Sequence, residues 1–214
     1  MRIAVLASGS GSNLQALLDA CRPPEPAQIA LVASNVPGAG ALERAGRAEV
    51  PTWVIPDPAD GAAIIAKLRE ARIDLVVLAG YLKLVPLEVV SAFDGRMVNI
   101  HPALLPAFGG KGMYGMRVHR AVIASGATLS GPTVHLVNAE YDRGPILAQW
   151  PVPVLPGDTP EQLRDRVLAV EHQLLPAVVL ATARAGRPVR LTPDGVSFSP
   201  SPTPRTPSMT AEPS

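Results

Sequence analysis

Apolar runs bounded by turn residues alternate with stretches of helical periodicity along the first half of this chain. The apolar runs cover residues 2–7, 29–33, 52–55, 75–78 and 97–100, and the helical stretches cover 14–18, 41–48, 62–71 and 87–93. This alternation is typical of a parallel sheet whose crossover helices lie on its faces. The sequence therefore predicts an α/β fold with a Rossmann-like, doubly wound, mostly parallel sheet and helices on both faces.

The second half adds a glycine-rich loop at 106–115, a helix at 116–124, strands around 133–137 and 146–152, and a long helix at 159–184. Asp158-Thr159-Pro160 marks the start of the long helix, because Asp or Thr can cap a helix and proline fits its first position. Residues 1–190 are predicted to form one domain. Residues 191–214 are rich in Pro, Ser and Thr and too poor in apolar side chains to offset chain entropy, so we expect a disordered tail.

Composition narrows the classes of protein to which the chain can belong. Its formal net charge of +1 argues against a nucleic-acid-binding protein, which usually carries a strong basic excess. The uninterrupted apolar runs are far shorter than the about 20 residues of a bilayer span, so no membrane segment is predicted. The one cysteine, Cys21, is expected to be an apolar residue at the end of the first helix. In the absence of an export signal after Met1, we expect a cytoplasmic protein.

A Gly-Ser-Gly-Ser-Asn segment, residues 9–13, joins the first strand to the first helix. The backbone N–H groups of such a turn lie at the positive end of a helix dipole and can bind phosphate. A dinucleotide fingerprint is incomplete, because Leu14 replaces its third glycine and Ser34-Asn35, with no acid, ends the second strand. Residues 110–112 lack the Ser or Thr that follows a P-loop lysine. A phosphomonoester site is therefore predicted, with a plain tight turn as the alternative.

An amide and an imidazole stand two residues apart in the segment Asn99-Ile100-His101-Pro102. Residues two apart in a strand share a face, so Asn99 and His101 are expected to present a hydrogen-bond donor and a proton-transfer group to one point. Asp142 supplies a carboxylate in a turn before a later strand. Asn, His and Asp are sufficient for the oxyanion and proton-transfer roles of acyl transfer, although a strand-end Asn, a core His and a turn Asp are the plain alternatives.

The remaining histidines do not form a metal-binding pattern. His119 lies in a predicted helix, His135 in a predicted strand, and His172 follows Glu171 in the long helix. The chain has no His-Glu-x-x-His and no Cys-x-x-Cys segment. We therefore predict no metal site.

The segments Asn-Ile-His-Pro at 99–102 and Asp-x-Gly-Pro-Ile at 142–146, together with the glycine-rich turn, resemble those of the glycinamide ribonucleotide formyltransferases of purine synthesis. The resemblance covers residues 1–190, which would then be the catalytic domain. It implies transfer of the formyl group of 10-formyltetrahydrofolate to the amino group of 5'-phosphoribosylglycinamide. It further implies direct transfer through a tetrahedral intermediate, without a covalent enzyme intermediate and without a metal.

The resemblance also assigns roles to residues. Asn99 would stabilise the oxyanion, and His101, if cationic, would donate a proton, with Asp142 orienting it, raising its pKa and relaying a proton through water. The ribonucleotide would be bound by one set of residues: Gly11, Ser12, Asn13, Gly80 and Glu171. The folate would be bound by another: Leu82, Lys83, Leu84, Val85, Asn138, Ala139, Glu140 and Tyr141.

Two segments depart from the pattern of the relatives. Lys83 stands where many relatives have Arg, and residues 57–62 offer no match for an arginine that some relatives use, so the grip on the folate glutamate tail is left open. The loop at 108–115 is longer than in several relatives, and we interpret it as a lid.

Other functions share the same three residue types. A formyltetrahydrofolate deformylase passes the formyl group to water but usually has an extra N-terminal regulatory domain. A methionyl-tRNA formyltransferase adds a basic C-terminal domain, where this chain has a Pro/Ser/Thr-rich segment. A noncatalytic binding protein is the third alternative. We expect small-molecule substrates only, no nucleic acid and no membrane, and a monomer or homodimer.

The predicted boundary of the tail can be tested by deletion. Removal of residues 192–214 should leave the rate of formyl transfer unchanged, because the predicted tail contributes no strand, helix or site residue. A large loss of activity in a steady-state assay would show that the tail belongs to the folded domain.

Overall fold

A seven-stranded sheet organises the computed structural model, which describes residues 1–191. The elements of the first half are β1 (Arg2–Leu6), α1 (Ser12–Ala20), β2 (Gln28–Ser34), α2 (Gly40–Arg47), β3 (Thr52–Val54), α3 (Gly61–Glu70), β4 (Leu75–Leu78), α4 (Leu87–Ala92) and β5 (Met97–His101). Those of the second half are α5 (Met116–Ala124), β6 (Leu129–Ser130), β7 (Thr133–Leu136), β8 (Ile146–Gln149), β9 (Val152–Pro153) and α6 (Pro160–Ala185).

The strand order is β3-β2-β1-β4-β5-β7-β8. The strands from β3 to β5 are parallel, β7 is antiparallel to β5, and β8 is antiparallel to β7. The chain builds outward from β1 to β3 on one side and then from β4 to β5 on the other. The order therefore reverses between β1 and β4, and ligands bind at such a reversal in open α/β sheets. The predicted doubly wound, mostly parallel fold is confirmed.

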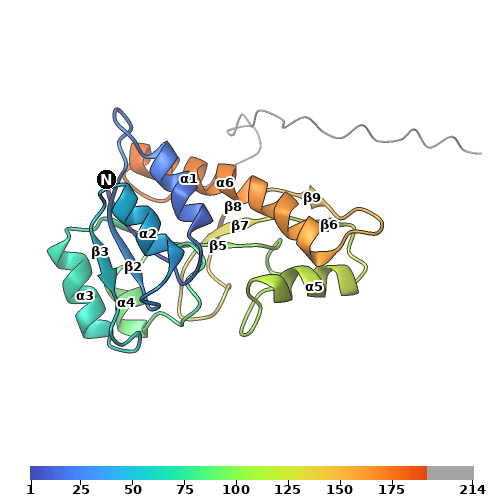
Figure 1. The fold of residues 1–214 in the computed structure, drawn as a ribbon, viewed down its shortest axis with the longest axis horizontal. Coiled ribbons are helices and arrows are strands. Elements are labelled where there is room, and N and C mark those ends of the chain that lie inside the picture. The colour runs from blue at the N-terminus through green and yellow to red at the C-terminus, as the bar shows by residue number, and fades with distance from the viewer. Residues whose placement is uncertain (192–214) are drawn as a thin grey trace, which may run out of the picture.

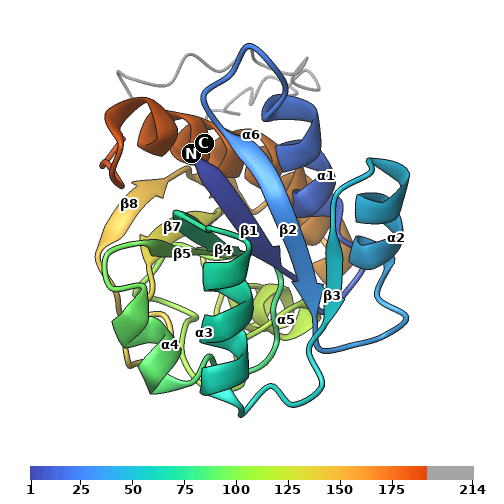
Figure 2. The same cartoon turned by 90° about the vertical axis from the view of Figure 1, so that its left-hand side faces the viewer.

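Helices cover both faces of the sheet (Figures 1 and 2). Ile3 and Val5 of β1 belong to the core under α1, α2 and α6, whereas Ala4 and Leu6 belong to the core under α3 and α4. This alternation explains why β1 is apolar from Ile3 to Leu6, since each side chain of a parallel strand covered on both faces is buried.

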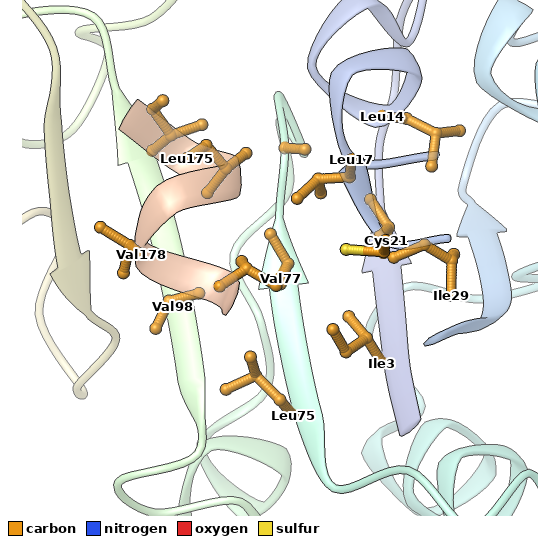
Figure 3. Packing of buried hydrophobic residues seen from close by; sticks show 14 of the residues in the cluster. Ile3, Leu14, Leu17, Cys21, Ile29, Leu75, Val77, Val98, Leu175 and Val178 are labelled. Atoms are coloured by element: carbon orange, nitrogen blue, oxygen red, sulfur yellow. The ribbon is translucent and has the colours of Figure 1, made fainter. Parts of the chain in front are cut away.

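The first core is formed mainly by α1 and α6 against the strands. In Figure 3, Leu175 and Val178 of α6 lie near Val77 and Val98, while Leu17 and Cys21 lie on the α1 side. Burial raises the pKa of the Cys21 thiol to about 11, with a smaller contribution from Glu25. The predicted apolar role of Cys21 is confirmed.

Helix α6 extends beyond the sheet and forms a third core with α5 and β9 (Figure 1). Thr159 caps its start and Pro160 lies in the first turn, as the sequence predicted, and Gln162 completes a capping box with Thr159. By length and composition α6 could cross a membrane. Its apolar side chains are used in two cores, with Leu163 and Val167 in the third and Leu174, Leu175, Val178 and Val179 in the first. The packing therefore accounts for α6 as a core helix.

One predicted strand is wrong. The segment 146–152 is divided into β8, which extends the main sheet, and β9, which pairs with β6 in a separate two-stranded sheet. Pro151 lies between them and has no N–H to continue a ladder, so the chain leaves the main sheet here.

At the last described residue, the Leu191 N–H donates to the Leu147 carbonyl of β8 at 2.8 Å. The predicted tail from residue 192 onward lies outside the described residues.

Gly144 generates a stability prediction, because a Cβ atom at this buried position would lie 1.7 Å from the Leu136 carbonyl oxygen. Gly144→Ala should lower the free energy of unfolding by about 1–3 kcal/mol or more and displace the turn that precedes β8. Urea unfolding measures the change. Gly46→Ala is the control, since Gly46 lies in α2 with nothing within 4 Å of an added Cβ, and should raise stability by about 0.5–1 kcal/mol. Equal stability of the two variants would contradict the packing described here.

Candidate active site

A cleft of about 450 Å³ opens at the carboxyl ends of the strands, where the strand order reverses. The glycine-rich turn after β1 and the segment after β4 meet there, and Ser8 N–H donates to the Gly80 carbonyl at 3.0 Å. The end of β5, the loop at 110–116, the turn at 141–142 and one side of α6 complete the walls. The walls of the cleft therefore come from segments that are far apart in the sequence, between Ser10 and Glu171.

Asn99 and His101 lie at the end of β5 and both face Asp142. The Asn99 side-chain nitrogen is 3.5 Å from Asp142 Oδ1, and His101 Nδ1 is 3.6 Å from Asp142 Oδ2. All three residues line the cleft. The structure thus brings together the three residues that the sequence grouped as catalytic.

His101 is almost fully buried, and its ring is fixed from both sides. Its Nε2–H donates to the Phe108 carbonyl at 2.8 Å, so Nδ1 is the nitrogen that faces Asp142. Burial lowers the pKa of His101, and the opposing effects of Asp142 and the Phe108 carbonyl do not reverse the shift. Asp142 does raise the pKa of His101, as the sequence analysis expects, but the net shift is downward because desolvation of the cation outweighs attraction to the carboxylate.

Several neighbouring groups favour the carboxylate form of Asp142. Gly110 N–H donates to Oδ2 at 2.8 Å, and His135 Nε2 lies 3.6 Å from Oδ1. Burial alone would raise the pKa of Asp142, but contact with His135, the charge of His101 and the Gly110 N–H together lower it. The residue has a φ of 54°, in the left-handed region that Asp tolerates better than most residues. Its backbone conformation therefore directs the carboxylate into the cleft.

His135 is part of this cluster, although the sequence placed it only in a strand. In the antiparallel pairing of β5 with β7, Asn99 lies directly opposite His135. The Asn99 side-chain N–H donates to His135 Nε2 at 3.0 Å. The alternation of Val134, His135 and Leu136 indicated a strand, but its partner and register could not be predicted from one segment alone.

The predicted ribonucleotide residues surround the start of α1. Ser12, Asn13, Gly80 and Glu171 line the cleft, whereas Gly11 does not. Gly11 has a φ of 75° and lies so close to Ala41 that a Cβ would be 2.6 Å from its Cα. Its observed role is thus to shape the turn. The first turn of α1 has no side-chain cap, which leaves its N–H groups available to an anion.

Glu171 is buried on α6 and accepts a hydrogen bond from the Asn13 side chain at 2.7 Å. Burial raises its pKa to about 7, and the Asn13 bond only partly opposes this. The Asn13 side-chain oxygen is buried without a partner among the described residues. This corner of the cleft therefore offers both a titratable acid and a free acceptor.

The predicted folate residues divide into two groups. Leu82, Lys83, Leu84 and Val85 line the cleft after β4, and so does Tyr141. Ser8 Oγ accepts the Leu82 N–H at 2.9 Å and so ties this segment to the glycine-rich turn. Asn138, Ala139 and Glu140 lie outside the lining in an exposed turn, where the Asn138 side chain accepts the Glu140 N–H at 3.1 Å. The sequence expects the backbone of this turn to contact the folate, and that contact stays a prediction.

The loop interpreted as a lid forms one wall of the cleft and contacts the catalytic residues through its backbone, as the Phe108 and Gly110 bonds show.

His119 of α5 also lines the cleft and was missed by the sequence analysis. Burial, with smaller effects of Arg164 and His101, lowers its pKa to about 4, so it is neutral at pH 7. Within residues 1–191, no group of three or more His, Cys, Asp or Glu side chains is arranged to hold a metal ion.

Comparison with known proteins gives consistent matches. The sequence pattern of the formyl transferase family matches residues 1–179. A phosphoribosylglycinamide formyltransferase of Mycobacterium tuberculosis is 43% identical over 191 residues, which cover 86% of this chain and 86% of that protein. A chloroplastic phosphoribosylglycinamide formyltransferase of Arabidopsis thaliana is 48% identical over 186 residues, or 83% of this chain and 64% of that protein. The chain thus spans less than two thirds of this plant relative.

The fold is also that of a solved structure. The crystal structure of glycinamide ribonucleotide transformylase 1 from Symbiobacterium toebii superposes with a TM-score of 0.81 at 43% identity, and the match covers 89% of this chain and 93% of that chain. The fold of this chain is therefore a known one.

The raised pKa of Glu171 predicts a pH dependence of stability. Between the ordinary pKa of 4.5 and about 7, the folded protein retains a proton that the unfolded chain releases, so stability falls as the pH rises through this window. The full effect is roughly 3 kcal/mol. Urea unfolding at pH 5 and pH 8 should show that Glu171→Gln gains stability relative to the unsubstituted protein at the higher pH. Glu161→Gln, on an exposed position of α6, controls for charge removal, and an equal pH profile for both variants would contradict the assignment.

Proposed function

Because this chain belongs to the formyl transferase family, we propose that it transfers the formyl group of 10-formyltetrahydrofolate to the amino group of 5'-phosphoribosylglycinamide in de novo purine synthesis. The observation that supports this most strongly is the convergence of Asn99, His101 and Asp142 in one cleft. An anion site adjoins the cluster on one side and an apolar wall on the other. The phosphate of the ribonucleotide needs the anion site, and the ring system of the folate needs the apolar wall.

The glycine-rich turn fits the phosphate end of the ribonucleotide. Ser12 begins α1, whose first N–H groups have no side-chain cap and favour an anion. Glu171 and the free Asn13 oxygen face the same cleft and can accept hydrogen bonds from the amine or the ribose hydroxyls. In this arrangement the phosphate is bound near α1 and the amine lies toward the catalytic cluster.

The wall after β4 fits the pterin and its attached ring. Leu82, Leu84 and Tyr141 line the cleft with exposed fractions of 52%, 54% and 41%. Exposed apolar side chains beside a cleft favour an aromatic ligand, because its binding removes their surface from water. Lys83 on the same segment supplies positive charge for the carboxylates of the folate tail.

Direct transfer requires one bond to form and one to break. The substrate amine adds to the formyl carbon, the carbon–nitrogen bond of the donor then breaks, and a proton moves from the attacking to the leaving nitrogen. The Asn99 amide stabilises the oxyanion of the tetrahedral intermediate. Asp142 is ionised and lies 3.6 Å from each of two imidazoles, so it can accept the proton from the amine, directly or through water. His101 supplies the proton path to the leaving nitrogen.

The lowered pKa of His101 bears on its role. A neutral imidazole donating through Nε2 to Phe108 has no N–H left for the substrate, so donation to the formyl oxygen requires either a proton on Nδ1 or release of the Phe108 bond. The negative charge that develops in the intermediate favours the cationic ring. We therefore propose that His101 is protonated during the reaction rather than before it.

The first experiment measures release of tetrahydrofolate from 10-formyltetrahydrofolate with and without 5'-phosphoribosylglycinamide. The expected result is release that requires the ribonucleotide and is matched by formylated product. Release without the ribonucleotide, matched by formate, would make water the acceptor and overturn the proposal in favour of a deformylase. Binding of both compounds without turnover, unchanged in His101→Ala, would overturn it in favour of a noncatalytic binding protein.

Asn99→Ala should reduce kcat about a hundredfold to a thousandfold, because one oxyanion donor is lost. Gln28→Ala is the control, since Gln28 is an exposed amide at the start of β2, outside the cleft lining. Steady-state kinetics with both substrates gives the comparison. An Asn99→Ala protein that is folded and as active as the control would remove Asn99 from the site.

The cytoplasmic location and the monomeric or homodimeric state of the protein remain predictions.

A further inference from the structure

We propose that His135 is a positioning residue that fixes the orientation of the Asn99 amide and thereby sets the direction of the oxyanion donor. The inference rests on the proposed function, because it takes Asn99 as the donor. It assigns a role to a buried histidine that the transfer chemistry itself does not require. The argument starts from the register of β5 and β7.

The hydrogen bonds of His135 define which ring nitrogen carries the proton. Nδ1 lies 2.8 Å from the Leu136 carbonyl oxygen, and a carbonyl can only accept, so Nδ1 carries hydrogen. In the neutral ring, Nε2 then has a lone pair. This lone pair faces the Asn99 side-chain nitrogen at 3.0 Å and accepts one of its two N–H groups. The bond to the main chain of β7 therefore fixes the tautomer of the His135 ring, and this tautomer fixes the orientation of the Asn99 amide.

The alternative orientation of the amide is unfavourable. Rotation by half a turn would place the Asn99 oxygen against the Nε2 lone pair, and it would also turn the oxygen toward the Asp142 carboxylate, now 3.5 Å from the amide nitrogen. Two repulsive contacts would replace two attractive ones. Because His135 and Asp142 are both buried or nearly so, little water is present to screen this difference.

The observed orientation leaves one amide hydrogen for the substrate. The bond to His135 at 3.0 Å occupies the first N–H, whereas the second is 3.5 Å from Asp142 Oδ1, longer than a good hydrogen bond. An oxyanion formed beside Asn99 can take this second hydrogen without breaking the bond to His135. His135 thus keeps the donor pointing at the reacting carbon while it makes no contribution to the chemistry.

Two substitutions distinguish the role of the Nδ1 donor of His135 from that of its Nε2 acceptor. His135→Asn keeps a donor near the position of Nδ1 and removes the acceptor at Nε2, whereas His135→Gln places an acceptor near Nε2. We expect His135→Asn to lower kcat about tenfold to a hundredfold with the KM of both substrates little changed, because donor geometry is lost. His135→Gln should recover most of that loss. Equal losses in both variants, or a raised KM, would overturn the proposal by indicating general packing or direct substrate contact.

A double-substitution cycle tests whether His135 acts through Asn99. In the Asn99→Ala background, His135→Asn should change kcat by less than about twofold, because the amide that it orients is absent. The same tenfold or larger loss in both backgrounds would show that His135 acts independently of Asn99 and would overturn the inference. The cycle uses whichever turnover the wild-type protein shows, formyl transfer or hydrolysis, so a deformylase outcome leaves it intact.

A measurement on the unsubstituted protein covers the case in which His135→Asn fails to fold. Selective ¹⁵N labelling of Asn and His permits detection of the scalar coupling through the hydrogen bond between the Asn99 amide nitrogen and His135 Nε2. A coupling between these nitrogens, absent in Asn99→Ala, is the expected result. A His135 ring with hydrogen on Nε2 and none on Nδ1 would overturn the proposal, whether or not the protein transfers formyl groups.

Discussion

The carboxylate of Asp142 is the group on which the arrangement of the site depends, because three separate parts of the chain converge on it. The end of β5 brings His101 to one oxygen and Asn99 to the other, β7 brings His135, and the loop before α5 brings the Gly110 N–H. A buried carboxylate is stable only when its oxygens have donors. The same contacts that keep it ionised therefore hold the strand, the loop and the turn in one geometry.

Burial shifts the pKa values of three ionisable groups of the site. Burial lowers the pKa values of His101 and His119 and raises that of Glu171, so each tends toward its uncharged form. Only for Asp142 do the neighbouring donors outweigh burial. One ionised carboxylate among buried groups that tend toward their uncharged forms suits a reaction in which a proton must move.

The fold was largely predictable from the sequence, because apolar runs and helical periodicity depend on local residues. Strands β1 and β4 and helix α5 needed no knowledge of their neighbours. The cluster of Asn99, His101 and Asp142 followed from strand periodicity and from the resemblance. His135 could not be found in this way, since its role depends on the register between β5 and β7. The upward effect of Asp142 on the pKa of His101 was predictable, but the net downward shift was not, because burial is a property of the folded chain and outweighs the carboxylate.

The loop before α5 contacts the catalytic residues only through main-chain atoms, the Phe108 carbonyl and the Gly110 N–H. Exchange of side chains in this loop leaves both atoms in the chain, so the loop can diverge in sequence while its contacts with the imidazole and the carboxylate persist. What restricts it is conformation. Positive φ values at Phe108, Gly110, Gly112 and Gly115 require a backbone that few residues other than glycine adopt. The shape of the backbone, rather than the polar side chains of the loop, therefore determines these two contacts.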